Sequence, residues 1–490
     1  MVHNPSQRRW GSLMAVKPIS AFNLGAPIGA LTRSLTAKDL LALGIGAIIG
    51  TGVFVLTGPA AAHYAGPAAA ISFALAGLTA ALAGLCYAEM AAIIPLSGSA
   101  YTYAYATVGE LWAFLIGWNL MLEYGLAAAM VSVAWSSYAV AALQQVLGLV
   151  VPAQLCQAPL MPDPIGGGLR LTGAYLNLPA GLVLLGITAM LCRGTELSMR
   201  VMARMVVVKL AVVALFLIVA IPFVDVAHWH PFIPPNEGPF GQFGISGVFQ
   251  AATLLFFSYC GFDAISTAAQ ECRDPQRDLP RAMLGSIALA MLLYIAVTLV
   301  LTGVVDYRQL GREDAMSTVM SLTGHVWLSS VVQLGALMGL STVMLAQIFG
   351  QVRILFAMAG DGLLPQGLLR LAGPTAIPRR LTCIVGGLAA LLGSLLPLEI
   401  LGELSSVGTL VAFTLVSLGV MILRLRRPEL PRSFRVPGGP FTLPLLSAGC
   451  NGLLLATAKP QNLLRLSLWM GCGLAVYLLY SYPRSRLRRS

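Results

Sequence analysis

The stretch Leu40 to Gly58 reads LLALGIGAIIGTGVFVLTG, and it is long enough to cross a membrane because a spanning helix needs about 20 apolar residues. Four glycines occupy its centre and remove the β-carbons that favour a regular helix: Gly44, Gly46, Gly50 and Gly52. In hydrocarbon, each freed backbone N–H or C=O group costs on the order of several kcal/mol unless a partner meets it. The run therefore predicts a broken membrane helix whose free peptide groups face a polar ligand.

An unwound Gly50-Thr51-Gly52 segment suggests an anion site. Its N–H groups, backed by the positive end of the following half-helix, would point at an anion such as a carboxylate. Small residues four apart also let two membrane helices pack closely. At this point the sequence leaves both interpretations open.

The composition around this stretch is that of a polytopic membrane protein. The charged fraction is 10% and the hydrophobic fraction is 57%, so the apolar surface exceeds what one soluble core can bury. The net charge of +11 comes without a basic face or a groove-reading motif, so we expect no nucleic-acid partner. Eight cysteines are scattered without a CxxC pair, which supports neither a disulfide framework nor a metal site.

Runs of about 20 apolar residues predict twelve transmembrane helices in an all-α fold. They lie near residues 38–63, 67–93, 109–144, 175–193, 203–223, 245–270, 282–304, 326–357, 381–397, 401–423, 441–458 and 464–481. Most of the 30 lysines and arginines fall on one side if the N-terminus is cytoplasmic, as positive-inside sorting predicts. We therefore expect a multi-pass protein of the cytoplasmic (inner) membrane with both termini in the cytoplasm. The oligomeric state is not predictable from these features.

A second interrupted run, QAATLLFFSYCGFDAISTAAQ at 250–270, forms the sixth expected span. It comes five spans after the first broken helix, with four spans between them, so the two cross the membrane in opposite directions. Matching breaks in two halves predict a 5+5 inverted repeat with a mid-membrane site. The expected segments are a cytoplasmic tail (1–37), the first repeat (38–224), the second repeat (245–424), two additional helices (441–481) and a basic cytoplasmic tail (482–490).

Four ionisable residues lie within the expected spans, where each costs about 2.5–3.5 kcal/mol on insertion scales. Lys209 either snorkels to the cytoplasmic surface or points inward, where it would serve as a protonatable group in place of a bound metal cation. Glu123 lies too deep to snorkel and is either structural or functional. Glu89, close to the cytoplasmic face, suggests a structural or gate ion pair, and Asp263 follows the second break, where a structural role is the simpler reading.

Five motifs resemble the amino acid-polyamine-organocation superfamily, and within it the cationic amino acid transporter type and its bacterial proton-coupled relatives. They are GIGAIIGTGVFVLTGPAA (44–61), CYAEMAAIIPLSGSAYTYAY (86–105), GWNLMLEYG (117–125), FFSYCGFDAISTAAQECRDPQRDLPRA (256–282) and GQVRILFAMAGDGLLP (350–365). The resemblance covers about residues 36–480. It implies five-plus-five inverted spans followed by two more.

The resemblance also implies roles for particular residues. The backbone N–H groups at Ile49, Thr51 and Gly52 would hold a substrate carboxylate, and carbonyls around Phe257, Ser258 and Cys260 would take the α-ammonium group. Lys209 and Glu123 would couple transport to protons, and Gln347 would line the side-chain pocket. Leu96 stands where related chains often carry a basic residue, which is expected to weaken a cytoplasmic gate pair with Glu89.

We therefore expect a secondary active transporter that takes up L-amino acids with protons by alternating access, and no enzymatic activity or cofactor. The partners are an L-amino acid, protons and membrane lipid. One alternative is a sodium-coupled or exchange-type carrier of amino acids or polyamines with the same fold. Another is an amino acid sensor that binds without transporting.

Overall fold

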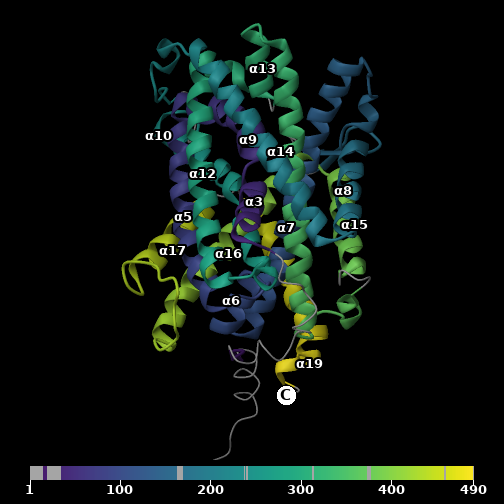
Figure 1. Cartoon of the computed structure of the whole chain (residues 1–490), viewed down its shortest axis with the longest axis vertical. Coiled ribbons are helices and arrows are strands. Elements are labelled where there is room, and N and C mark those ends of the chain that lie inside the picture. The colour runs from purple at the N-terminus through teal and green to yellow at the C-terminus, as the bar shows by residue number, and fades with distance from the viewer. Residues whose placement is uncertain are drawn as a thin grey trace, which may run out of the picture.

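A computed structural model describes residues 15–18, 35–162, 169–236, 238, 241–311, 314–371, 377–456 and 460–488. Most of the expected N-terminal tail lies outside these residues, as do the last two residues of the C-terminal tail. Long helices run along the longest axis of the molecule (Figure 1), and the C-terminus lies at the end that carries α6 and α19.

The helices of the first half begin with an interrupted one. They are α3 (Ala37–Ile48), η2 (Gly52–Leu56), α4 (Thr57–Ala60), η3 (Ala61–Ala65), α5 (Ala69–Ile93), α6 (Ala100–Thr107), α7 (Glu110–Leu147), α8 (Leu178–Leu191) and α9 (Thr195–Ala220). Short strands β1 (Leu160–Pro162) and β2 (Leu169–Leu171) pair antiparallel between α7 and α8.

The second half repeats the interruption. Its helices are α10 (Gly244–Phe256), η8 (Phe257–Tyr259), α11 (Ala264–Thr267), η9 (Ala269–Glu271), α12 (Pro275–Val304), α13 (Ala315–Leu322), α14 (Val326–Gly360), α15 (Arg379–Leu395) and α16 (Leu398–Arg426). The chain continues with α17 (Thr442–Ala456), α18 (Pro460–Val476), η12 (Tyr477–Ser481) and α19 (Tyr482–Arg484).

Within the described residues, 8 helices are long and apolar enough to cross a membrane, which confirms a polytopic membrane protein. The expected number was twelve. One of the eight, Ala37–Ile93, has 57 residues, about 85 Å at helical rise, which is far more than a hydrocarbon core of about 30 Å. Its backbone breaks at Gly66, where φ is +59°. Three further expected spans coincide with helices of 14 to 17 residues, α8, α15 and α17.

Packing places the first broken helix at the centre of the molecule. Helix α3 contacts α9, α12 and α14, while α7 runs along α14 and α16, and α5 runs along α12. In Figure 1, α3 lies between α12 and α14. Any ligand at the break in this helix would therefore be surrounded by protein.

Candidate functional site

The first break lies at Ile49 and Gly50. Helix α3 ends at Ile48, and the next residue, Ile49, is extended (φ −78°, ψ 102°) and donates its N–H to the Ile45 carbonyl oxygen at 3.0 Å. Thr51 is helical again (φ −57°, ψ −37°). The unwound segment is thus shorter than the expected Gly50-Thr51-Gly52. Phe54 donates its N–H to the Gly50 carbonyl oxygen at 3.0 Å, so the N–H groups of residues 50–52 precede the first hydrogen bond of the second half-helix. Such leading N–H groups have no partner within their own helix.

The second break lies where it was expected. Cys260 is extended (φ −62°, ψ 137°), and Gly261 has φ of +120°, a conformation that L side chains rarely adopt. A β-carbon at Gly261 would also lie 2.9 Å from Ala47 Cβ and 3.0 Å from the Ala47 carbonyl oxygen. Glycine therefore permits both the turn and the close approach to the first broken helix.

The two breaks face each other. A β-carbon at Gly52 would lie 2.6 Å from Ser258 Cβ and 2.7 Å from Tyr294 Cζ. Ser258 is 1% exposed, and its hydroxyl oxygen is buried without a hydrogen-bond partner in the described part of the chain. Because buried polar atoms are normally satisfied, this hydroxyl and the leading N–H groups beside it are available to a polar ligand.

Lys209 points to the first break. Its side chain is fully buried, so the snorkelling alternative does not describe this structure. The ammonium donates to the carbonyl oxygens of Ile45 (3.1 Å), Gly46 (3.2 Å) and Ile49 (2.5 Å) and to Thr342 Oγ1 (2.8 Å). The three carbonyl oxygens lie at the C-terminal end of α3, which is the negative end of the helix dipole. The Lys209 amino group is therefore held at the break in a cage of oxygen atoms.

Tyr294 and Thr342 are two site residues that the sequence analysis missed. The Tyr294 hydroxyl lies 2.7 Å from the Ile48 carbonyl oxygen and 2.9 Å from the Ser258 carbonyl oxygen, so it bridges the two breaks. Thr342 lies 2.9 Å from the Gly46 carbonyl oxygen and also contacts Lys209. The available signal was a lone polar side chain within an apolar run, but such residues are too common in these spans to single out.

The backbone carbonyls at the second break that are expected to bind the substrate already accept some hydrogen bonds within the protein. The Phe257 carbonyl accepts the Cys260 N–H at 3.1 Å, and the Ser258 carbonyl contacts Tyr294. Each carbonyl oxygen has two lone pairs, so both retain capacity for an ammonium group. Gln347 is buried on α14.

Glu123 and Asp263 lie within the helix bundle and are both nearly inaccessible. Asp263 accepts a hydrogen bond from the Tyr124 hydroxyl. One Glu123 carboxylate oxygen, Oε2, has no partner among the described residues. The two carboxyl groups therefore differ in their hydrogen bonding, although both were singled out by the same feature, a charge inside a span.

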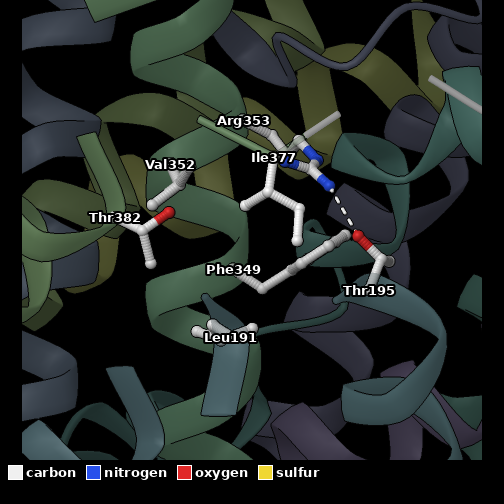
Figure 2. Close-up of a pocket in the computed structure, with 7 residues that line it drawn as sticks. All are labelled: Leu191, Thr195, Phe349, Val352, Arg353, Ile377 and Thr382. Carbon is white, nitrogen blue, oxygen red and sulfur yellow. Dashed lines mark hydrogen bonds between the residues drawn. The ribbon is translucent and has the colours of Figure 1, made fainter. Parts of the chain in front are cut away.

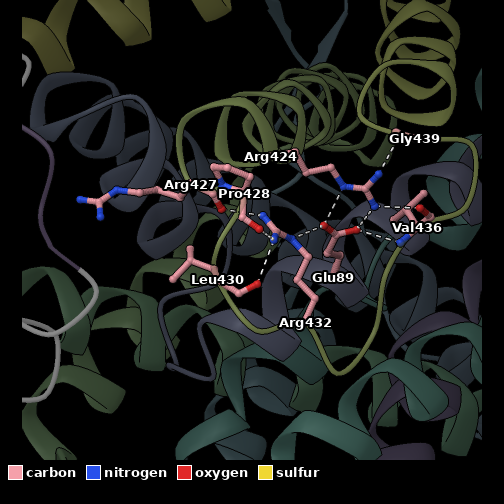
Figure 3. Close-up of polar contacts among 8 residues, drawn as sticks. All are labelled: Glu89, Arg424, Arg427, Pro428, Leu430, Arg432, Val436 and Gly439. Atoms are coloured by element: carbon pink, nitrogen blue, oxygen red, sulfur yellow. Dashed lines mark hydrogen bonds and ion pairs between the residues drawn. The ribbon is translucent and has the colours of Figure 1, made fainter.

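Glu89 is the centre of a buried ion cluster (Figure 3). Arg424 contacts it through two guanidinium nitrogens, Arg432 Nε lies 3.3 Å away, and the Val436 N–H donates to it at 2.8 Å. Position 96 supplies none of these partners, so the expectation that Leu96 weakens a gate pair stays a prediction. The partners of Glu89 come from α16 and the segment after it, which its sequence neighbours do not reveal.

A second buried ion pair lies at the C-terminal end of the second broken helix. Arg353 Nε donates to Glu271 Oε1 at 2.7 Å, and Arg353 Nη2 donates to Thr195 Oγ1 at 3.1 Å. Figure 2 shows Arg353 and Thr195 in a pocket that is also lined by Leu191, Phe349, Val352, Ile377 and Thr382. Glu271 is also joined to the first broken helix, since its carbonyl accepts the Leu35 N–H at 2.9 Å. The two broken helices are thus tied to each other at this end.

Several known proteins resemble this chain over most of its length. A family model described as "Amino acid permease" matches residues 35–482. The methylthioribose transporter of Bacillus subtilis (strain 168) is 42% identical over 98% of this chain and 100% of its own length. The branched-chain amino acid permease BcaP of the same organism is 43% identical over 94% of this chain and 95% of its length. Human cationic amino acid transporter 4 is 35% identical over 85% of this chain and 63% of its length.

Proposed function

Because the chain belongs to the amino acid permease family, we propose that this membrane transporter takes up neutral L-amino acids together with protons. The family and the relatives named above are transporters, not enzymes. Branched-chain amino acids are the first substrates to test, since the BcaP relative is named for them. The substrate would lie between the two breaks.

The observation that carries the proposal is the pairing of unlike groups at the breaks. The leading N–H groups of residues 50–52, at the positive end of the second half-helix, suit a carboxylate. The carbonyls of Phe257, Ser258 and Cys260 suit an ammonium group, and the unpartnered Ser258 hydroxyl can meet either. A zwitterionic α-amino acid presents both charges within a few ångströms, whereas a simple acid or amine presents one.

Proton coupling is proposed for Lys209, with Glu123 as a second candidate. The oxygen cage around the Lys209 ammonium resembles the surroundings of a bound metal cation, so the lysine can do there what sodium does in other carriers. Protonation would favour the state ready for substrate, and loss of the proton on the cytoplasmic side would loosen the Ile45–Ile49 carbonyls. Glu123 Oε2 has no partner in the described residues, which supports a role in exchanging a proton.

We also propose twelve membrane passes, with α8, α15 and α17 as short passes and Ala37–Ile93 as two. The cytoplasmic ends would then carry the Glu89–Arg424 and Glu271–Arg353 pairs, and both termini. Since the two broken helices are joined at Leu35 and Glu271, they would rock together with α5 and α12 during alternating access.

The test is uptake of radiolabelled L-leucine into liposomes with and without an inward proton gradient. We expect the gradient to drive accumulation in the wild type and to have no effect in Lys209→Ala. Equal dependence on the gradient in both would remove the role of Lys209. A sodium requirement would favour a sodium-coupled carrier, and binding without accumulation would favour a sensor.

A second candidate substrate is a methylthio sugar, because the methylthioribose transporter matches this chain over its whole length. Such a substrate lacks the carboxylate and the ammonium group. If labelled methylthioribose accumulates and L-leucine does not, the breaks bind hydroxyl groups rather than a zwitterion.

A further inference from the structure

Two cysteines from different helices lie close together beside the cytoplasmic ion pairs. Cys192 follows α8, and Cys383 lies in the first turns of α15, with 3.8 Å between their sulfur atoms. The two helices pack side by side, as Figure 1 shows. Of the eight cysteines, which are all free, this is the pair whose thiols contact each other in the described part of the chain.

The pair is accessible and lies in a positive environment. Cys383 is exposed and Cys192 is half-buried. Arg379 donates from Nε to the Cys192 carbonyl oxygen at 3.2 Å, and Arg193 and Arg380 are exposed nearby in the chain. Cys383 is the more exposed of the two thiols, so it reacts first with a reagent from solution, because thiol reactivity follows exposure.

We propose that Cys192 and Cys383 are an oxidation site that forms a reversible disulfide between α8 and α15 under peroxide-type oxidants. The Cys383 thiolate attacks one peroxide oxygen, which breaks the O–O bond, releases hydroxide and leaves a sulfenic acid. Cys192 then attacks this sulfur and displaces the second hydroxide. In total, two thiols and one H2O2 give one disulfide and two water molecules.

The geometry requires little rearrangement. A disulfide has an S–S length of about 2.04 Å, so the two sulfur atoms, now 3.8 Å apart, must approach by about 1.8 Å.

A disulfide at this position would lie next to the Arg353–Glu271 ion pair. Leu191 and Thr382, which directly precede the two cysteines, line the pocket in Figure 2 that also holds Thr195 and Arg353. Thr195 accepts a hydrogen bond from Arg353, whose other partner is Glu271. The disulfide would therefore fix the turn between α8 and α9 against α15, next to the ion pair at the end of the second broken helix.

The test is oxidation of the full-length protein in membranes with hydrogen peroxide, followed by alkylation of free thiols and mass spectrometry. Cys192→Ser is the test variant. Cys472→Ser is the matched control because Cys472 is also an exposed free thiol and lies on a different helix, α18. We expect oxidation to lower the alkylation of Cys383 about five-fold or more in the wild type and in Cys472→Ser, with a linked 192–383 peptide that dithiothreitol releases.

In Cys192→Ser, no linked peptide forms, and Cys383 is instead recovered as a sulfenic acid. A second readout is thermal unfolding followed by tryptophan fluorescence. The midpoint should rise on oxidation in the wild type and stay unchanged in Cys192→Ser, because a cross-link between distant parts of the chain restricts the unfolded state. If Cys383 remains fully alkylatable, or links only to other molecules, the proposal is overturned. A linked peptide without a change in the midpoint would overturn the tethering of α8 to α15.

Discussion

The substitution Gly52→Ala tests the contact between the two breaks. The added methyl group would lie 2.6 Å from Ser258 Cβ, 2.8 Å from Ser258 Oγ and 2.7 Å from Tyr294 Cζ. Ser258 Cβ is fixed to the backbone, and Tyr294 is held by contacts to the Ile48 and Ser258 carbonyls. The methyl group must therefore push the two broken helices apart or displace the tyrosine.

The expected cost has two parts. Overpacking of a well-packed site costs about 1–3 kcal/mol, and displacement of Tyr294 forfeits the hydrogen bond of its single O–H group, worth about 0.5–1.5 kcal/mol. We expect the free energy of unfolding in detergent to fall by about 1.5–4.5 kcal/mol, from the sum of these terms. Uptake of L-leucine should fall at least about ten-fold, because a site shifted by this much no longer presents its N–H groups correctly.

The matched control is Gly449→Ala on α17, where a β-carbon meets no heavy atom within 4 Å. It should leave uptake unchanged and stability unchanged or raised by up to about 1 kcal/mol. Adding Ser258→Gly to Gly52→Ala removes two of the three close contacts and should recover part of the lost stability. Wild-type stability and uptake in Gly52→Ala would refute the packed arrangement of the breaks.

Two other predictions concern the bridging and gating groups. Tyr294→Phe should lower the free energy of unfolding by about 1–3 kcal/mol and slow uptake, because the Ile48 and Ser258 carbonyls lose their partner. The control is Tyr175→Phe at an exposed position. It should change neither the free energy of unfolding, measured by denaturant titration, nor the rate of uptake. Glu89→Gln should lower the free energy of unfolding by about 3–5 kcal/mol, because it leaves the buried Arg424 guanidinium without its carboxylate. Glu429→Gln, which removes a carboxylate from an exposed pair, should change the free energy of unfolding by no more than about 0.5 kcal/mol. Equal effects of the two glutamate variants in denaturant titration would contradict the assigned burial.

The sequence predicted those parts of the fold that depend on local composition. Glycine inside an apolar run predicted both breaks, because hydrocarbon makes an interruption costly enough to be informative. The family resemblance drawn from the motifs is confirmed by the match over residues 35–482. The extent of the first break was less predictable, since Thr51 is helical and its residue type does not distinguish a cap from an unwound position.

Partners from distant segments were not predictable. Glu89 pairs with Arg424, 335 residues away, and neither residue carries a local signal for the other. Tyr294 and Thr342 were missed for the same reason, since their importance arises only when the breaks are brought against α12 and α14. The roles of Lys209, Glu123, Asp263 and Gln347 stay predictions, and the structure adds their surroundings.

The central claim is that the two breaks bind a zwitterion through its opposite charges. The most direct measurement is competition with L-leucine uptake by leucinamide, which lacks the carboxylate, and by N-acetyl-leucine, which lacks the ammonium group. A hydrogen bond to a charged group is worth about 1.5–3 kcal/mol, so each analogue should bind about 10- to 100-fold more weakly than L-leucine. Competition by either analogue at the same concentration as L-leucine would contradict the claim.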